Sequence, residues 1–421
     1  MTAIDTVVIG AGHSGLAVSH LLGKVGRDHV VLDRGRVAES WRSERWDSLR
    51  LLTPRWMTRL PGSQYAGADQ EGFMGVRELV DHLEGYAAAS CAPVVSGVEV
   101  LEVSQCRGRY LVTTTGGSWL AQNVVVATGA TGRPHRPEGI DRLDDGIRIM
   151  SSSQYRNPGQ LAPGGVLVVG ASASGAQIAD ELARAGRRVV MAVGSHNRVP
   201  RRYRGMDLFW WLEQTGRLAR LGEARGINPE ARREPSLQVA GREPNDHRGT
   251  DMDLNVLQSL GVELVGRLDG VHRHRVDFRH DLARTTSEAD ARLNRFLDEI
   301  DAFVDASHLT GEVEEAIRPH PVFVGRPRGR LNLRAEGIGT VLLATGFRPH
   351  HPWLKVPVVA PDGRIRQYRG VTLAPGLYTV GQWFQHRRDS TFIDGARFGA
   401  EDVVSHLCTG EFAALERADV S

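Results

Sequence analysis

Residues 4–33 decide the fold, and they read IDTVVIGAGHSGLAVSHLLGKVGRDHVVLD. An apolar strand runs into a glycine-rich turn, which is followed by a helical pattern and a second apolar strand. Gly10 allows a tight turn, Gly12 lets a pyrophosphate approach the backbone, and Gly15 lets the helix pack closely on the strand. Asp33 ends the second strand, where a carboxylate can accept hydrogen bonds from a ribose. The stretch therefore predicts a dinucleotide-binding unit whose phosphates lie at the helix N-terminus.

A second unit of the same kind has the turn GASASG at residues 170–175. A buried-type strand precedes this turn, and an alanine-rich helix and another strand follow it. Ser172 replaces the middle glycine and adds a hydroxyl donor. No acidic residue ends the last strand; the loop beyond it contains Arg198, Arg201 and Arg202, whose guanidinium groups suit the 2′-phosphate of NADPH. The alternative is that these arginines only reflect a chain in which nearly all 52 basic residues are arginine.

Two further strands end in the same three residues, since residues 124–129 read VVVATG and residues 341–346 read VLLATG. Small residues at a strand end let the backbone pass close to a cofactor. Residues 76–89 and 287–304 have the apolar periodicity of amphipathic helices, with Ser287 as a possible cap of the second one. Two nucleotide turns in one chain indicate electron transfer between two cofactors; the alternative is a duplication in which one site has degenerated.

Composition and charge exclude several classes of protein. The 421 residues carry 52 basic and 50 acidic side chains, a net charge of +2, which does not resemble the basic footprint of a nucleic-acid binder. The sequence contains no run of 18 apolar residues, so we expect no membrane-spanning helix. Because the first strand is expected to begin at Ile4, we also expect no signal peptide. Cys91, Cys106 and Cys408 are far apart and form no CxxC pair, which argues against a disulfide scaffold, a metal site or a redox dithiol. We therefore expect a cytoplasmic protein without a metal.

At this point the sequence resembles the two-dinucleotide flavoproteins and, among them, the class B flavin-dependent monooxygenases. The likeness is to the auxin-forming flavin monooxygenases of plants and to single-component bacterial relatives. The segments that carry it are residues 10–15, 40–51, 170–175, 343–349 and 378–382. The resemblance implies an α/β fold with two Rossmann-like dinucleotide-binding domains, in which the NADPH domain is inserted into the FAD domain. It places the FAD domain at residues 1–160 and 333–421, and the NADPH domain, with a helical insertion, at residues 161–332.

The sequence departs from that family in its best-known signature, FxGxxxHxxx(Y/F). Counted back from Tyr155, the Phe, Gly and His positions hold Asp145, Ile147 and Ser151. The Asn that lies near the flavin in animal-type members is replaced by Leu52. We expect these departures to affect coupling or substrate class. The surroundings of Tyr155 also lack the Trp of Baeyer–Villiger enzymes, which favours oxygenation at a heteroatom.

The resemblance implies an FAD-dependent, NADPH-consuming monooxygenase that transfers one oxygen atom of O2 from a flavin C4a-hydroperoxide to nitrogen or sulfur of a small organic substrate. Trp46, Leu52 and Thr53 are the candidate catalytic residues that would form the wall facing the flavin, with ordinary core packing as the alternative. The residues expected to bind the cofactors FAD and NADPH are Gly10, Gly12, His13, Ser14, Gly15, Asp33, Arg34, Trp41, Arg42, Thr128, Gly129, Gly170, Ser172, Ser174, Gly175, Arg198, Arg201, Arg202, Thr345, Gly346, Gly381, Gln382, Ile393 and Asp394.

Asp394 has two interpretations. In the resembling proteins, the helix that begins near this residue points its N-terminus at the flavin, where the helix dipole stabilises the reduced ring. The alternative role for Asp394 is a simple helix N-cap.

Two other functions stay open from the sequence. The chain could be an NADPH:acceptor flavin reductase of the ferredoxin-reductase kind, which passes electrons to a carrier. It could instead be an uncoupled NADPH oxidase or a redox-sensing protein that binds both dinucleotides. A homodimer is also possible. Oxygen consumption that depends on a third small molecule separates the three functions.

Overall fold

The structure is a computed structural model that describes residues 1–220, 237–238 and 252–412. Its first sheet has the order β23-β24-β25-β8-β1-β2-β5, and β6 and β7 extend it beside β8 as an antiparallel meander. The central strands β25, β8, β1, β2 and β5 are parallel, as expected for a sheet that helices cover. The strand bounds are β1 Thr2–Ile9, β2 His29–Leu32, β5 Val94–Val95, β6 Val100–Cys106, β7 Arg109–Thr114, β8 Gly117–Val126, β23 Gln367–Tyr368, β24 Val371–Thr372 and β25 Leu377–Thr379.

The second sheet is parallel throughout, with the order β10-β21-β11-β12-β17. Its strands are β10 Arg148–Ser151, β11 Gly165–Val169, β12 Val189–Ala192, β17 Glu263–Val265 and β21 Ile338–Leu343. All of them lie in sequence between the strands of the first sheet that precede residue 127 and those that follow residue 366. The expected α/β fold with two Rossmann-like units is therefore confirmed. The expected boundaries at 160 and 333 are not those of the sheets, because β10 and β21 both pair within the second sheet.

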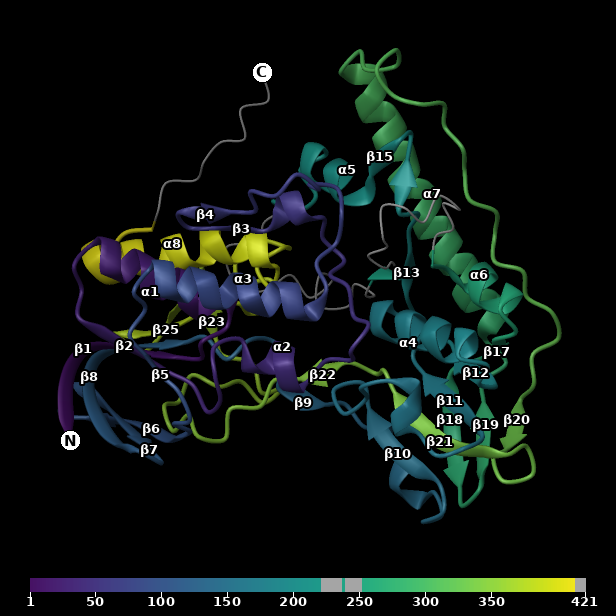
Figure 1. The fold of residues 1–421 in the computed structure, drawn as a ribbon, viewed down its shortest axis with the longest axis horizontal. Coiled ribbons are helices and arrows are strands. Elements are labelled where there is room, and N and C mark those ends of the chain that lie inside the picture. The colour runs from purple at the N-terminus through teal and green to yellow at the C-terminus, as the bar shows by residue number, and fades with distance from the viewer. Residues whose placement is uncertain (221–236, 239–251, 413–421) are drawn as a thin grey trace.

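Helices cover both sheets. Figure 1 shows α1, α3 and α8 side by side over one face of the first sheet, with α4 and α6 against the second. The helix bounds are α1 His13–Lys24, α2 Glu39–Ser43, α3 Val76–Ala89, α4 Ala173–Arg184, α5 Leu208–Gln214, α6 Leu254–Ser259, α7 Leu282–Ala306 and α8 Ile393–Thr409. The expected helix at residues 76–89 is confirmed. Ser287 is not a cap, because α7 begins at Leu282 with Asp281 at its N-cap, and the buried Leu282 and Thr285 extend its packed face.

The chain crosses between the two sheets twice, and the two crossings pair with each other as the antiparallel strands β9 Arg133–Pro134 and β22 Phe347–Arg348. The remaining strands are short: β3 Arg59–Leu60, β4 Ser63–Gln64, β13 Asn197–Arg198, β14 Arg202–Tyr203, β15 Met206–Asp207, β16 Leu237–Gln238, β18 Leu268–His272, β19 Arg275–Phe278 and β20 Arg330–Asn332. Three single turns of 3-10 helix lie at Arg55–Met57, Ile140–Arg142 and Pro158–Gln160. Within the described residues, no helix combines the length and the apolar character that crossing a membrane requires.

Candidate active site

The first glycine turn joins β1 to α1, and its geometry explains each glycine. Gly10 has φ +111°, a backbone conformation that residues with a side chain rarely adopt. A Cβ on Gly15 would lie 1.9 Å from the carbonyl oxygen of Gly10, so the close approach of helix and turn excludes any side chain there. A Cβ on Gly12 would meet no atom within 4 Å, which leaves open space above the turn at the N-terminus of α1. The predicted roles of Gly10 and Gly15 agree with this geometry, and the pyrophosphate contact of Gly12 stays a prediction.

Asp33 holds this turn together from the end of β2. Its carboxylate accepts hydrogen bonds from the backbone N–H of Ala11 at 2.7 Å and from that of Gly35 at 2.8 Å. A carboxylate has further lone pairs, so these bonds leave room for the predicted contact with a ribose. Arg34 beside it forms an ion pair with Glu44 at 2.8 Å on the surface. Both cofactor contacts stay predictions.

The second glycine turn joins β11 to α4 and repeats the first one closely. Gly170 has φ +113°, and a Cβ on Gly175 would lie 1.9 Å from the carbonyl oxygen of Gly170. Ser172 occupies the N-cap position of α4 in an extended conformation, yet its side chain makes no capping hydrogen bond. Its hydroxyl is therefore available to a ligand at the helix N-terminus, where unpaired N–H groups favour an anion.

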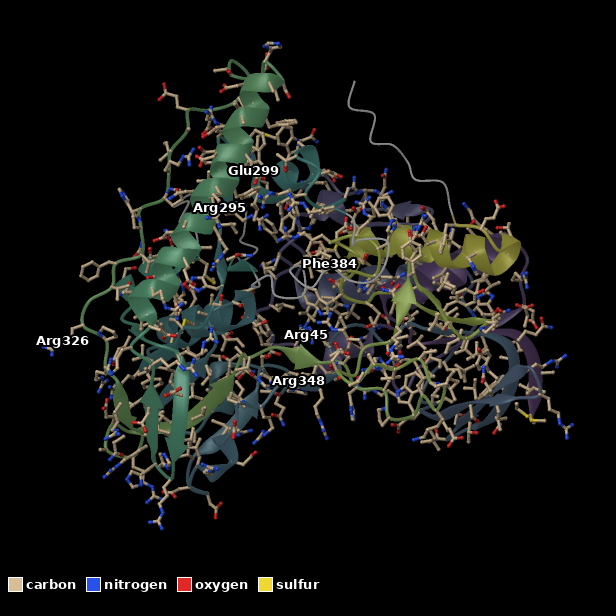
Figure 2. The ribbon with its side chains drawn as sticks, turned by 180° about the vertical axis from the view of Figure 1, so that it is seen from behind. Arg45, Arg295, Glu299, Arg326, Arg348 and Phe384 are labelled. Carbon is tan, nitrogen blue, oxygen red and sulfur yellow. The ribbon has the colours of Figure 1, made fainter. Side chains whose placement is uncertain are left out.

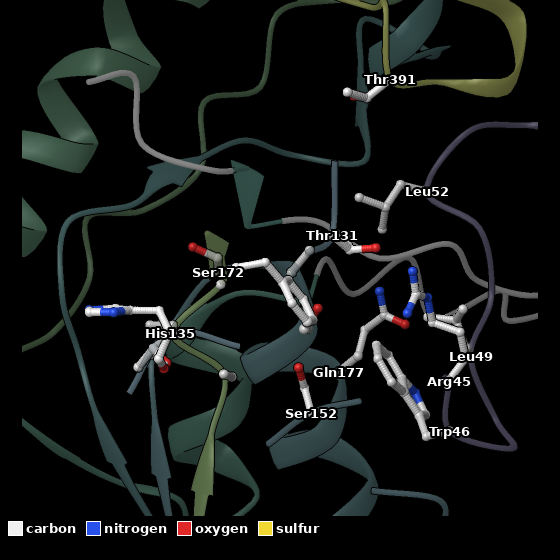
Figure 3. Close-up of a pocket in the computed structure, with 18 of the residues that line it drawn as sticks. Arg45, Trp46, Leu49, Leu52, Thr131, His135, Ser152, Ser172, Gln177 and Thr391 are labelled. Carbon is white, nitrogen blue, oxygen red and sulfur yellow. The ribbon is translucent and has the colours of Figure 1, made fainter. Parts of the chain in front are cut away.

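A cavity of about 730 Å³ connects the two turns (Figure 3). Apolar and aromatic side chains form much of its wall, and the candidate catalytic residues Trp46, Leu52 and Thr53 all line it. Of the predicted cofactor residues, those that line it are His13, Trp41, Gly170, Ser172, Ser174, Thr345, Gly346 and Ile393. Those that the structure does not place on its wall are Gly10, Gly12, Ser14, Gly15, Asp33, Arg34, Arg42, Thr128, Gly129, Gly175, Arg198, Arg201, Arg202, Gly381, Gln382 and Asp394.

His13 is a buried polar group at the first turn. Burial lowers the pKa of His13 to about 4, although a hydrogen bond involving the backbone of Thr391 acts in the opposite direction. The imidazole is therefore neutral at physiological pH. Its Nε2 atom has no hydrogen-bond partner among the described residues. A buried polar atom that faces a cavity without a partner indicates a position where a ligand binds.

The arginines predicted to read a 2′-phosphate are engaged elsewhere. Arg198 is only 3% exposed and binds Asp253 and Asp290 at 2.6 and 2.7 Å. Arg201 is buried, pairs with Asp207 at 2.5 Å and donates to the carbonyl oxygen of Leu52 at 2.7 Å. The prediction is wrong for these two arginines, because carboxylates already satisfy them away from the nucleotide turn.

Arg202 is exposed, and its guanidinium lies 3.6 Å from Glu71, away from the cavity wall. A different arginine faces the second turn. The Nε and Nη2 atoms of Arg267 lie 3.8 and 3.9 Å from the position of a Cβ on Gly194, just beyond the end of β12. In the described part of the chain, no carboxylate lies within ion-pair distance of Arg267. Sequence reasoning missed Arg267, because this residue follows β17 and is brought to the site by the pairing of β17 with β12.

Asp394 at the start of α8 is held by arginine side chains. It is 2% exposed and pairs with Arg59 through both oxygens, at 2.5 and 2.9 Å, and with Arg397 at 3.1 Å. The N-cap of α8 is Phe392, so the interpretation of Asp394 as an N-cap is wrong. Its neighbour Ile393 lines the cavity instead.

Tyr155 is the residue of the degraded signature that the chain retains. Tyr155 is fully buried and donates a 2.7 Å hydrogen bond to Glu181 of α4. Burial raises the pKa of Tyr155, and the hydrogen bond to Glu181 does so further, so the phenol stays protonated. Ser151, at the position of the missing histidine, shares a 2.9 Å hydrogen bond with Ser153. Tyr155 therefore ties the segment that follows β10 to α4.

The chain is similar to several known proteins. The family model described as "Pyridine nucleotide-disulphide oxidoreductase" matches residues 7–206. An uncharacterized CzcO-like oxidoreductase of Geobacillus kaustophilus is 29% identical over 407 residues, which cover 96% of this chain and 98% of that protein. Indole-3-pyruvate monooxygenase YUCCA1 of Oryza sativa subsp. japonica is 32% identical over 208 residues, 48% of this chain and 51% of that protein.

Among solved structures, the flavin-containing monooxygenase of Stenotrophomonas maltophilia superposes with a TM-score of 0.65 at 20% identity, covering 97% of this chain and 99% of that one. This likeness extends the shared fold over both sheets. The expected likeness in fold to the two-dinucleotide flavin monooxygenases is therefore confirmed.

Proposed function

We propose that the chain is an FAD-dependent, NADPH-consuming monooxygenase that transfers one oxygen atom of O2 to nitrogen or sulfur of a small organic substrate. One observation carries the proposal: residues of the second glycine turn and His13 of the first turn line the same cavity. Two dinucleotides bound at the two turns would bring their reactive rings together in that cavity, as electron transfer between them requires.

The residues present fit FAD at the first turn. The open space above Gly12 is a cradle that a Cβ would fill, and the N-terminus of α1 offers N–H groups to a pyrophosphate. The unpartnered Nε2 of His13 offers a further polar contact. Bound FAD would accept a hydride from NADPH and supply the chemistry with O2.

The second turn fits NADPH in the same way. Ser172 and the N-terminus of α4 would hold the pyrophosphate. Arg267 supplies a cation beyond β12, where the adenosine ribose of a Rossmann-bound dinucleotide lies. We assign to Arg267 the contact with the 2′-phosphate that the sequence had suggested for the arginines near residue 200.

The cavity wall supports oxygen transfer by excluding water. Trp46 is 3% exposed, and Leu51 and Leu52 line the same cavity, so a reactive centre there would face several apolar groups. Thr53 adds one hydroxyl. No acid–base pair is needed for transfer to a soft nucleophile, because the protein's task is positioning and protection.

A flavin reductase is the second candidate, since the matching family model is named for pyridine nucleotide-disulphide oxidoreductases. The cysteines argue against the disulfide branch of that family. Cys91 and Cys408 are exposed, Cys106 is partly buried, and none of the three lines the cavity. Reduction of a separate electron carrier stays the alternative.

The deciding experiment measures NADPH oxidation, O2 consumption and hydrogen peroxide release by the FAD-loaded protein against a panel of amines and thioethers. A monooxygenase is expected to release less peroxide per NADPH when its substrate is present, and to place one ¹⁸O atom from ¹⁸O2 in the product. A reductase would instead reduce an added ferredoxin or dye without O2. Transfer to the carrier with no labelled product from any compound would contradict the proposal.

A further inference from the structure

Arg45 is an arginine of the cavity that lacks an anionic partner. It follows α2 and lies near the centre of the molecule, between the two sheets (Figure 2). Its Nη1 atom donates to the carbonyl oxygen of Glu44 at 2.8 Å, and its guanidinium lies 5.1 Å from the ring centroid of Trp41. Within residues 1–220, 237–238 and 252–412, no carboxylate lies within ion-pair distance of it.

Two other arginines that are partly or fully buried do have carboxylate partners. Arg59 binds Asp394 and Glu213, and Arg198 binds two aspartates. Such pairing is expected, because an unpaired charge is costly to remove from water. Arg45 shows that cost: burial lowers its pKa, and the nearby cation of Arg156 lowers it further, while Glu44 acts in the opposite direction.

A second polar side chain, that of Gln177, lines the cavity near Arg45 (Figure 3). Gln177 lies in the second turn of α4 and is 8% exposed, and its amide makes no hydrogen bond to the described residues. Figure 3 shows the Arg45 and Gln177 side chains directed into the same part of the cavity, with Trp46 and Ser152 beside them. A guanidinium and an amide together offer several N–H donors, which suit the oxygens of a carboxylate or a phosphate.

We propose that Arg45 and Gln177 bind an oxyanionic group inside the cavity, which is either a phosphate of the second dinucleotide or a carboxylate of the substrate. The proposal rests on the proposed function only in naming these two sources. The planar fork of Arg45, held in orientation by Trp41 and the Glu44 carbonyl, is the shape that binds two oxygens at once. If the carboxylate is the occupant, the substrates are small organic acids.

The test compares R45Q and R45K with the parent in the FAD-loaded full chain, by calorimetric titration of NADP⁺, benzoate and neutral benzamide. R36Q is the matched control, because Arg36 is an exposed arginine near the same helix that pairs with Glu39. Loss of a charge-assisted pair is expected to raise the Kd of the anion by about tenfold or more in R45Q, and by less in R45K, which keeps the charge. R36Q is expected to bind all three probes as the parent does.

The two sources give different outcomes. A raised Kd for NADP⁺ alone identifies the dinucleotide phosphate, and loss of benzoate binding with benzamide unchanged identifies a substrate carboxylate. The proposal is overturned if R45Q binds both NADP⁺ and benzoate as tightly as the parent does. If R45Q does not fold, the proposal is overturned when R45K and the parent have equal Kd values for NADP⁺ and for benzoate. Flavin reduction by NADPH, followed in the same preparations, tests the proposed function separately.

Discussion

The open space above Gly12 gives a prediction that separates cofactor binding from folding. Gly12 has φ −81° and ψ 179°, an ordinary extended conformation, and a Cβ there would meet no protein atom within 4 Å. Gly12→Ala should therefore leave the unfolding temperature of the apoprotein within a few degrees of the parent value. If a pyrophosphate packs on this backbone, however, the added methyl occupies its place.

The magnitude follows from the cost of an added methyl group in a closely packed contact, about 1–3 kcal/mol. That cost corresponds to a Kd for FAD raised by about 5- to 150-fold. The assay is titration of the apoprotein with FAD, followed by the quenching of flavin fluorescence, beside a thermal melt of the same sample. Gly12→Ala should purify with little or no yellow colour.

Two alanine variants of the same segment serve as comparisons. A Cβ on Gly15 would lie 1.9 Å from the Gly10 oxygen, so Gly15→Ala should lower the melting temperature as well as FAD binding. Gly23 is exposed on α1 with nothing within 4 Å, and Gly23→Ala should keep FAD binding and stabilise the helix by about 0.5–1 kcal/mol. The reasoning is refuted if Gly12→Ala binds FAD within about twofold of the parent Kd.

Three more predictions follow from the site. Arg267→Ala should raise KM for NADPH by about tenfold or more and leave KM for NADH unchanged, whereas Arg202→Ala should change neither; an unaltered NADPH preference in Arg267→Ala would sink the assignment. Burial lowers the pKa of His13 from 6.5 to about 4. The unfolded chain therefore binds more protons than the folded chain between these pH values, and stability falls as the pH falls through this window. Between about pH 7.5 and pH 5, the parent should lose about 2 kcal/mol more unfolding free energy than His13→Asn, which lacks the titrating group. Denaturant melts in which the parent and His13→Asn lose the same amount would contradict this. Replacement of Cys91, Cys106 and Cys408 by serine should leave reduction of the flavin by NADPH intact; loss of that step in a folded triple variant would support a thiol in electron transfer.

The parts of the fold that the sequence predicted depend on neighbours along the chain. Each glycine turn is predicted from a strand, a six-residue motif and a helix that follow one another in the chain. The structure contains both turns, and each has the same close contact between turn and helix. Helix α3 is predicted because its apolar periodicity lies within 14 residues. The start of α7 was misplaced, since Ser287 has the right chemistry for a cap but lies on the packed helix that Asp281 begins.

The parts that the sequence could not predict depend on partners far along the chain. Arg198 looked available because its carboxylate partners lie 55 and 92 residues away, on segments whose positions the sequence does not reveal. The same reason hid Arg267, which reaches the second turn only because β17 pairs with β12. Arg45 and Gln177 were missed because each looks like a surface residue of its own segment until the cavity brings them together.

The two units differ most at one equivalent point, the end of the strand that follows the nucleotide helix. In the first unit this point holds Asp33, whose carboxylate is fixed by the N–H groups of Ala11 and Gly35. In the second unit the equivalent residue is the apolar Val193, and the guanidinium of Arg267 lies beside the next residue, Gly194. A 2′-phosphate would be repelled at the first point and attracted at the second, whereas an unmodified ribose hydroxyl can donate to Asp33. The charges therefore favour FAD at the first turn and NADPH at the second, and they do so independently of the order in which the two turns occur in the chain.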